Sequence, residues 1–225
     1  MVEQNIHFLH IGKCAGTQIK SVISQINSNH GSQLIFAHPH RITLGMLPQN
    51  APFFFSIRNP TSRFLSGFYS RKRKGFPRYN IEWTKYEAYA FSVFEHANEL
   101  AEALFSDGTL GQQAIAAMGS IGHVSQNQLN WFVRFGSFLT VRPPIWIIRQ
   151  EHFGRDLNNF LIRAHLGDLA PKIILDPKNQ HANDYEKVPK LSTKAQENLR
   201  QWYIQDVKFY ELCETWLASQ EANGP

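Results

Sequence analysis

The chain has 225 residues, 43% hydrophobic and 18% charged, which is enough to fold around a large core and excludes a disordered chain. Its formal net charge of +5 is uneven, because residues 4–81 contain ten Lys and Arg but no Asp or Glu, whereas the rest contains 13 basic and 18 acidic residues. This acid-free segment predicts an anionic partner. It also excludes paired-carboxylate hydrolysis and carboxylate-held Mg²⁺ or Ca²⁺ from that third of the chain.

Cysteine content and the apolar pattern limit the compartment and the kind of site. The two cysteines, Cys14 and Cys213, lack the spacing of a zinc site or a disulfide framework. No apolar run approaches the roughly 20 residues of a membrane helix. The N-terminus has neither the charged region nor the cleavage site of a signal peptide. We therefore expect a cytoplasmic protein with no membrane span.

The first third of the chain alternates short apolar runs with helical patterns. Apolar runs predict strands at residues 4–11, 34–37 and 53–57, and the helical pattern covers residues 16–27 and 60–73. Pro60 suits the first turn of the second helix. Because strand, loop and helix alternate, we expect parallel βα units with buried strands.

The remainder is mainly helical. We expect helices at residues 82–105, 111–132, 152–165 and 192–219, a late strand at 145–148 and a polar loop at 176–190. The whole pattern predicts one α/β domain over residues 1–225. Its three layers would be a parallel sheet flanked by helices, with a helical insertion at about residues 79–140.

The turn between the first strand and the first helix has the composition of an anion-binding loop. It reads HIGKCAGTQ over residues 10–18, where backbone N–H groups and the helix N-terminus could surround a phosphate or sulfate. Lys13 adds a full positive charge and Thr17 a hydroxyl group. The spacing differs from Walker A because no lysine directly precedes Thr17. The alternative is an ordinary turn with a solvated lysine.

A second cationic position follows the third strand. The segment FFFSIRNPTSRFLSGFY covers residues 53–69 and places Arg58 where a kinase or GTPase commonly has a metal-binding Asp. An arginine there favours an anion and repels a metal ion. Ser66 follows two helical turns later, so the two side chains could bind one phosphate. Alternatively, Arg58 pairs with a distant acid and Ser66 only packs.

Together these segments resemble the sulfotransferases, in particular the carbohydrate-type and bacterial branch that uses 3′-phosphoadenosine 5′-phosphosulfate (PAPS). HIGKCAGTQ is similar to the family's H-I-P-K-T-A-G-T-S, and IRNPTSRFLSGFY to its V-R-N-P-Y-D-R-F-L-S-A-Y-Y. A weaker resemblance runs through residues 149–153 to the final helix, so it covers most of the chain. The resemblance implies a P-loop nucleotide-hydrolase-like sulfotransferase fold, PAPS as the sulfuryl donor and no metal ion.

The resemblance also assigns residues to the donor. Lys13 and the loop would hold the sulfonate and the 5′-phosphate, through Gly12, Lys13, Cys14, Ala15, Gly16, Thr17 and Gln18. Arg58 and Ser66 would hold the 3′-phosphate. The chain departs from the family at Gly12, Cys14 and Gln18, which replace Pro, Thr and Ser. Since Gln18 lacks a hydroxyl group, that contact to the 5′-phosphate is not carried over.

Two histidines, His38 and His40, follow the second strand and are candidates for a general base. A neutral histidine with a pKa of about 6.5 can accept the proton of an attacking hydroxyl group. The segment HRITL at residues 40–44 resembles the family's catalytic histidine followed by Thr-Leu, so His40 is the first candidate and His38 the second. Glu151 is another possible base, but the resemblance gives it a packing role.

The run of cations at residues 71–74 is interpreted as a solvated helix end, with phosphate or acceptor binding as the alternative. The sequence and the resemblance together predict PAPS-dependent sulfuryl transfer to a hydroxyl group of a small molecule or glycan, with a carbohydrate or an anionic acceptor as the expectation, and without nucleic acid as partner. The rival hypotheses are a metal-dependent P-loop small-molecule kinase and a non-catalytic polyanion-binding module.

Overall fold

The computed structural model describes residues 5–132, 138–169 and 185–222. The chain divides into two compact units, and each unit has a hydrophobic core of its own. The first unit combines residues 1–59, 128–180 and 208–225, and the second combines residues 60–127 and 181–207. The predicted single domain over residues 1–225 stays a prediction.

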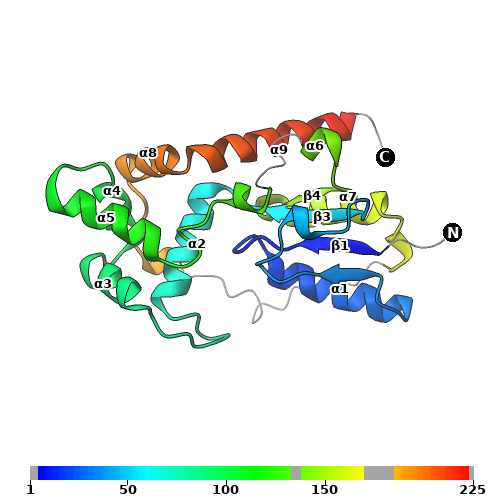
Figure 1. The fold of residues 1–225 in the computed structure, drawn as a ribbon, viewed down its shortest axis with the longest axis horizontal. Helices are drawn as coiled ribbons and strands as arrows, with labels where there is room; N and C mark the ends of the chain where they lie inside the picture. The colour runs from blue at the N-terminus through cyan, green and yellow to red at the C-terminus, as the bar shows by residue number, and fades with distance from the viewer. Residues whose placement is uncertain (1–4, 133–137, 170–184, 223–225) are drawn as a thin grey trace. The chain divides into compact units, whose positions relative to one another are not determined.

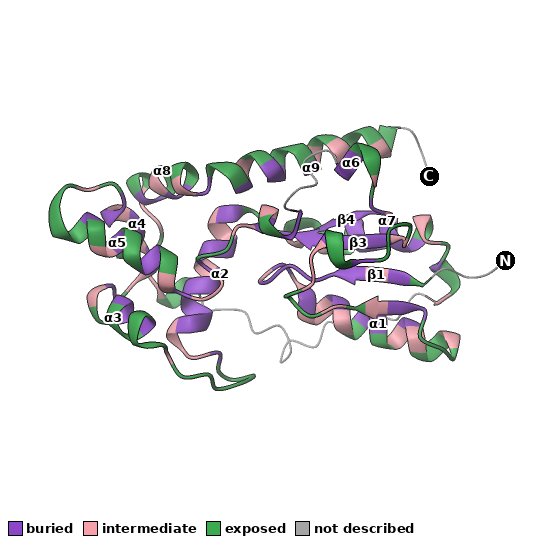
Figure 2. Ribbon diagram, in the orientation of Figure 1, coloured by how far each residue is buried: buried purple, intermediate pink, exposed green. Residues whose placement is uncertain are grey.

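The first unit contains a parallel four-stranded sheet in the order β2-β1-β3-β4 (Figure 1). Its strands are β1 (Ile6–Leu9), β2 (Ile35–Ala37), β3 (Phe53–Ile57) and β4 (Ile147–Arg149). The register pairs Ile6 with Ile35, Phe8 with Phe54 and Ile57 with Arg149. β3 and β4 are buried along their whole length (Figure 2), as expected for parallel strands covered on both faces. The predicted α/β class with a parallel sheet is confirmed.

Helices cover both faces of this sheet. Neighbouring residues of a strand point to opposite faces, so Phe54 stacks on Phe160 at 4.0 Å between ring centroids, whereas Phe55 packs against Phe209 at 6.4 Å. The first face is covered by α1 and α7, and the second by α9 with shorter helical segments. The three long helices are α1 (Gly16–His30), α7 (Phe153–Arg163) and α9 (Ile204–Ala222). The shorter helical segments of this unit are η1 (Leu44–Met46), η2 (Gln128–Phe132), α6 (Phe138–Val141), η3 (Gln150–His152) and η4 (Gly167–Leu169).

The second unit is helical and is built on α2 (Pro60–Lys72), α3 (Lys85–Val93), α4 (Ala97–Ala103), α5 (Gly108–Ser120) and α8 (Thr193–Trp202). The helical stretch predicted at residues 82–105 consists of two helices, α3 and α4. Thr84 caps α3 in a capping box with Glu87, which fixes where this helix begins. Of the polar loop predicted at residues 176–190, the structure describes only the end, which starts with η6 (Tyr185–Lys187).

The prediction of one continuous helix over residues 192–219 is wrong. α8 ends at Trp202 and α9 begins at Ile204, with Tyr203 between them at φ −96° and ψ 27°. Tyr203 is buried in the core of the second unit, and its hydroxyl group donates to the carbonyl oxygen of Val124 at 2.7 Å. The apolar spacing continues through this position, so the pattern alone does not reveal the break.

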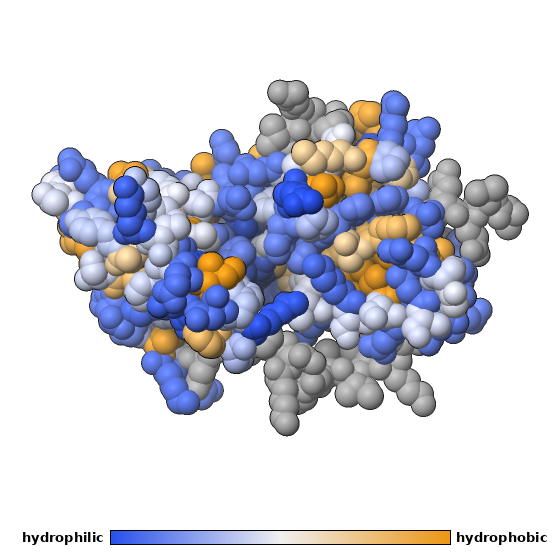
Figure 3. All heavy atoms as spheres, turned by 60° about the horizontal axis from the view of Figure 1, so that its bottom comes forward, coloured by the Kyte–Doolittle hydropathy of each residue, from blue (hydrophilic) through white to orange (hydrophobic). Residues whose placement is uncertain are grey.

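Exposed large apolar side chains occur in both units, among them Met46, Val141, Ile81 and Tyr86. On the face drawn in Figure 3, apolar residues form small separate patches among hydrophilic ones. No helix in the described ranges combines the length and the apolar character needed to cross a membrane.

Candidate functional site

The predicted anion-binding loop is the turn between β1 and α1. Lys13 and Ala15 adopt left-handed φ angles of 68° and 59°, which non-glycine residues avoid unless the surrounding structure holds them. Ala15 is the N-cap of α1, and its side chain makes no capping hydrogen bond. The N–H groups in the first turn of a helix lack intrahelical acceptors and carry positive partial charge. The turn therefore places two left-handed residues directly before the N-terminus of α1.

Gly16, the first residue of α1, is required by packing. A Cβ atom at Gly16 would lie 1.8 Å from Nε2 of His10, so the imidazole occupies the space that any larger residue needs. His10 is itself buried and stacks on Phe8 at 5.4 Å. Thr17 and Gln18 follow in the first turn and are partly exposed. The loop thus begins α1 at a position that only glycine fills without displacing His10.

The structure places Arg58 beside the loop that contains Lys13. Arg58 directly follows β3, the strand that pairs with β1, so it lies at the same sheet edge as the loop. Nη1 of Arg58 donates to the carbonyl oxygen of Lys13 at 3.5 Å, a long and weak hydrogen bond. Both residues are partly exposed. An anion at this edge could therefore meet Lys13, Arg58 and the helix N-terminus.

A buried glutamine that the sequence did not single out joins Arg58 to the loop. Oε1 of Gln128 accepts from the backbone N–H of Arg58 at 2.9 Å, and Nε2 donates to the carbonyl oxygen of Arg58 at 2.8 Å. The same Oε1 accepts from the thiol of Cys14 at 3.2 Å. Gln128 is completely buried. No motif surrounds it in the sequence, so only the fold reveals this contact.

Cys14 and Ser56 attach the loop to the sheet. The thiol of Cys14 is fully buried and lies 3.5 Å from the carbonyl oxygen of Gly12. The hydroxyl group of Ser56 donates to the carbonyl oxygen of Cys14 at 2.5 Å. Ser56 is the one polar residue in the otherwise apolar strand β3, and that anomaly in the sequence was a usable signal. Burial of the thiol favours the predicted loop role of Cys14 over a nucleophilic one.

The ring of His40 is oriented by a backbone carbonyl group. Its Nδ1 lies 3.0 Å from the carbonyl oxygen of His10, and because a carbonyl oxygen only accepts, Nδ1 of a neutral His40 carries the proton. The lone pair is then on Nε2. The backbone of His40 is held by Trp131, whose Nε1 donates to its carbonyl oxygen at 2.8 Å. The side chain of His40 is exposed, so an acceptor in solution can reach it.

His38 is engaged with a second histidine. Nε2 of His38 and Nδ1 of His7 are 2.8 Å apart, and the two rings are parallel within 5°. Their centroids are 5.1 Å apart, so the rings meet edge to edge through an N–H···N hydrogen bond. Burial lowers the pKa of both histidines, and His38 and Arg142 lower that of His7 further. Nε2 of His38 is therefore occupied by its bond to His7.

Ser66 lies in the second unit, on α2, where it is 8% exposed. Its predicted cooperation with Arg58 therefore stays a prediction. Near Arg58, the carboxylate of Glu151 accepts from the backbone N–H of Asn59 at 2.9 Å and from the hydroxyl group of Tyr210 at 3.3 Å. These contacts fit the packing role that the resemblance gave to Glu151.

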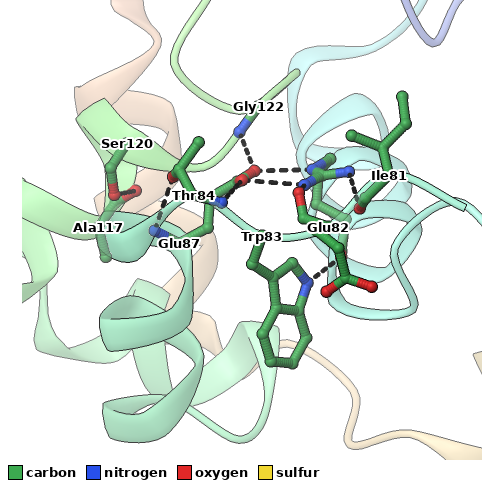
Figure 4. Close-up of polar contacts among 9 residues, drawn as sticks. Ile81, Glu82, Trp83, Thr84, Glu87, Ala117, Ser120 and Gly122 are labelled. Carbon is green, nitrogen blue, oxygen red and sulfur yellow. Dashed lines mark hydrogen bonds and ion pairs between the residues drawn. The ribbon is translucent and has the colours of Figure 1, made fainter.

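The interpretation of residues 71–74 as a solvated helix end is wrong for Arg71. Arg71 is buried and pairs with Glu87, Nε to Oε1 at 2.7 Å and Nη2 to Oε2 at 2.9 Å. Figure 4 shows that Glu87 also receives the backbone N–H groups of Thr84 and Gly122, at 3.0 and 3.1 Å. Burial alone would raise the pKa of Glu87, but these bonds outweigh burial and lower it to about 2.

The neighbouring cations are also engaged within the second unit. Lys72 pairs with Glu95 at 2.7 Å, and Lys74 pairs with Glu82 at 2.6 Å. A cavity of about 330 Å³ lies beside the Arg71–Glu87 pair, lined among others by Tyr79, Ile81, Thr84, Ser120 and His123. Because its charged groups are paired, this cavity offers a ligand mainly hydroxyl groups, an aromatic ring and an apolar side chain.

Comparison with known proteins identifies no relative. No family model matches the chain, and no curated protein and no solved structure matches it. Among the described residues, no group of three or more His, Cys, Asp or Glu side chains is arranged to hold a metal ion.

Proposed function

We propose that the protein is a sulfotransferase that moves a sulfuryl group from PAPS to a hydroxyl acceptor. The observation that carries the proposal is the sheet edge at which Arg58 meets the left-handed loop containing Lys13. The strand order β2-β1-β3-β4, with this loop and α1 after a central strand, supports a P-loop nucleotide-hydrolase-like sulfotransferase core with residues 79–140 as the insertion.

The residues of the loop suit a donor with several negative charges. The backbone of residues 12–18 and the ammonium group of Lys13 would hold the sulfonate and 5′-phosphate, and Arg58 would hold the 3′-phosphate. Bound there, PAPS supplies an activated sulfuryl group. Lys13 and the N–H groups at the start of α1 would stabilise negative charge that increases during transfer, which needs no metal ion. The absence of Asp and Glu from residues 4–81 avoids repulsion of such a donor.

His40 would act as the general base. Its Nδ1–H bond to the carbonyl oxygen of His10 orients the ring and leaves the lone pair on Nε2 to accept the proton of the acceptor hydroxyl group. We expect the acceptor to be a carbohydrate hydroxyl group and to contact residues 79–140.

A thermal-shift titration tests the donor. We expect 3′,5′-bisphosphoadenosine to raise the melting temperature in the absence of metal, and Arg58→Ala to abolish most of the shift. Lys74→Ala is the matched control, because Lys74 pairs with Glu82. Stabilisation by ATP with Mg²⁺ but not by 3′,5′-bisphosphoadenosine would favour the kinase instead. Equal losses in Arg58→Ala and Lys74→Ala, with a steep salt dependence, would favour a polyanion-binding module.

A second experiment tests the base. The protein is incubated with PAPS and a panel of sugars and phenols, and release of 3′,5′-bisphosphoadenosine is measured. His40→Ala should lower the rate at least about 100-fold, the contribution of a general base, while the melting shift with nucleotide is retained. His38→Ala is the comparison. If His40→Ala turns over at the rate of the unsubstituted protein, the base is another residue.

A further inference from the structure

Gln128 occupies an unusual place, because its side chain acts as a partner for backbone beyond the end of a strand. The pairing of β3 with β4 ends at Ile57 and Arg149. Arg58 is the next residue, and its N–H and C=O groups pair with the amide of Gln128 instead of another strand, at 2.9 and 2.8 Å. The side chain of Gln128 thus extends the ordered part of β3 by one residue, to Arg58.

The amide oxygen of Gln128 accepts two hydrogen bonds. A side-chain amide oxygen has two lone pairs, and Oε1 of Gln128 accepts from the N–H of Arg58 and from the thiol of Cys14. Nε2 supplies the donor for the carbonyl oxygen of Arg58. If Nε2 and Oε1 of Gln128 were exchanged, an amide N–H would face the N–H of Arg58, and two donors cannot bond. The orientation of the amide is therefore fixed by its partners.

These contacts connect the two cationic parts of the anion site. Through Arg58, Gln128 contacts the residue that follows β3, and through Cys14 it contacts the centre of the loop. Ser56 also holds the loop, because its hydroxyl group donates to the carbonyl oxygen of Cys14. The loop lies between two side chains that anchor it, while Gln128 itself is fully buried and contacts no solvent.

We propose that Gln128 is a positioning residue that holds Arg58 in register with the loop and so sets the affinity of the site for anions. The identity of the anion rests on the proposed function, but the role of Gln128 does not. A side chain that acts mainly through Arg58 should have a smaller effect on binding once the guanidinium group is removed.

A double-mutant cycle tests this, with 3′,5′-bisphosphoadenosine and inorganic pyrophosphate as probes in calorimetric titrations. Gln128→Leu should weaken binding about tenfold or more, as expected when a positioning contact is lost. In the Arg58→Ala background, Gln128→Leu should cause a smaller loss than in the unsubstituted protein. Asn130→Leu, an exposed position of the same 3₁₀ helix η2, should bind like the unsubstituted protein. Additive losses in the double variant would overturn the proposal.

Gln128→Glu separates positioning from simple packing. A protonated carboxyl group has one donor and one acceptor and can replace the amide, whereas a carboxylate cannot donate to the carbonyl oxygen of Arg58. Relative to the unsubstituted protein, this variant should therefore bind weakly at pH 8 and recover as the pH falls to 5.5. A constant ratio of affinities across this range would contradict the role assigned to Gln128.

Hydrogen exchange gives a readout that needs no ligand. In Gln128→Leu, the amide of Arg58 and those of residues 12–18 should exchange faster than in Asn130→Leu, with similar exchange in the second unit. Unchanged exchange at these amides would overturn the proposal. If pyrophosphate binds and 3′,5′-bisphosphoadenosine does not, the proposed donor fails while the cycle with pyrophosphate still decides the role of Gln128.

Discussion

Replacing Glu87 by glutamine should destabilise the protein in a pH-dependent way. The folded structure lowers the pKa of this carboxyl group from 4.5 to about 2. Since one pKa unit corresponds to about 1.4 kcal/mol, ionised Glu87 contributes on the order of 3 kcal/mol at pH 7. Glutamine resembles the protonated carboxyl group and loses this contribution, while Arg71 stays buried opposite a neutral amide.

The direction of the pH dependence follows from which state binds the proton first. The unfolded chain takes up a proton at Glu87 near pH 4.5, whereas the folded chain does so near pH 2. The stabilisation is therefore complete above pH 4.5 and is lost as the pH falls towards 2. By pH 3 the difference between the two proteins should have fallen to about 1 kcal/mol.

Urea unfolding at pH 7, 5, 4 and 3, followed by tryptophan fluorescence, measures the effect, because Trp83 bonds the backbone of Arg71 and reports on this cluster. Glu82→Gln is the control, since Glu82 pairs with Lys74 but its side chain is 72% exposed. That control should lose less than about 1 kcal/mol at any of these pH values. A Glu87→Gln effect that is equal at pH 7 and pH 3 would refute the reasoning.

Two further predictions concern the first unit. Gly16→Ala should lower stability by about 1–3 kcal/mol, because its Cβ atom would lie 1.8 Å from the ring of His10; an unchanged urea midpoint would contradict this. Burial lowers the pKa of His7 and His38, so the unfolded chain is protonated first and stability should fall as the pH drops below 6.5. His38→Asn should show a smaller fall in melting temperature between pH 7 and pH 5, and a fall as large as in the unsubstituted protein would count against the paired histidines.

The fold class could be predicted because it depends on local patterns. The apolar run at Phe53–Ile57 is typical of a buried strand, and the structure gives β3 those bounds. The glycine at position 16 and the apolar spacing after it similarly place the start of α1. The helix break at Tyr203 coincides instead with a hydrogen bond to Val124, 79 residues earlier in the chain. Pattern reasoning has no access to a contact of that separation.

The same distinction divides the candidate site. Lys13 could be singled out because it lies in a glycine-containing turn between a strand and a helix, and Arg58 because it takes the place of a metal-binding Asp after a buried strand. Gln128 could not, because a glutamine between Asn127 and Leu129 is ordinary until the fold sets it against Arg58, 70 residues away. Side chains that bind are visible from their chemistry. A side chain that positions another is visible only from its partners.

The acid-free segment shows why net charge along a sequence is a poor map of charge in space. Arg71, Lys72 and Lys74 belong to the segment, but the fold pairs them with glutamates at positions 87, 95 and 82, which lie just beyond its end. The densest cationic run is thereby explained without any anionic partner. The proposal of an anionic partner then depends on geometry instead of on net charge. In the first unit it rests on the left-handed loop with Lys13 and on the position of Arg58 at the sheet edge. We assign Arg58 to anion binding and Lys74 to an ion pair within the second unit. If Arg58→Ala leaves anion binding unchanged while Lys74→Ala weakens it, this assignment is wrong.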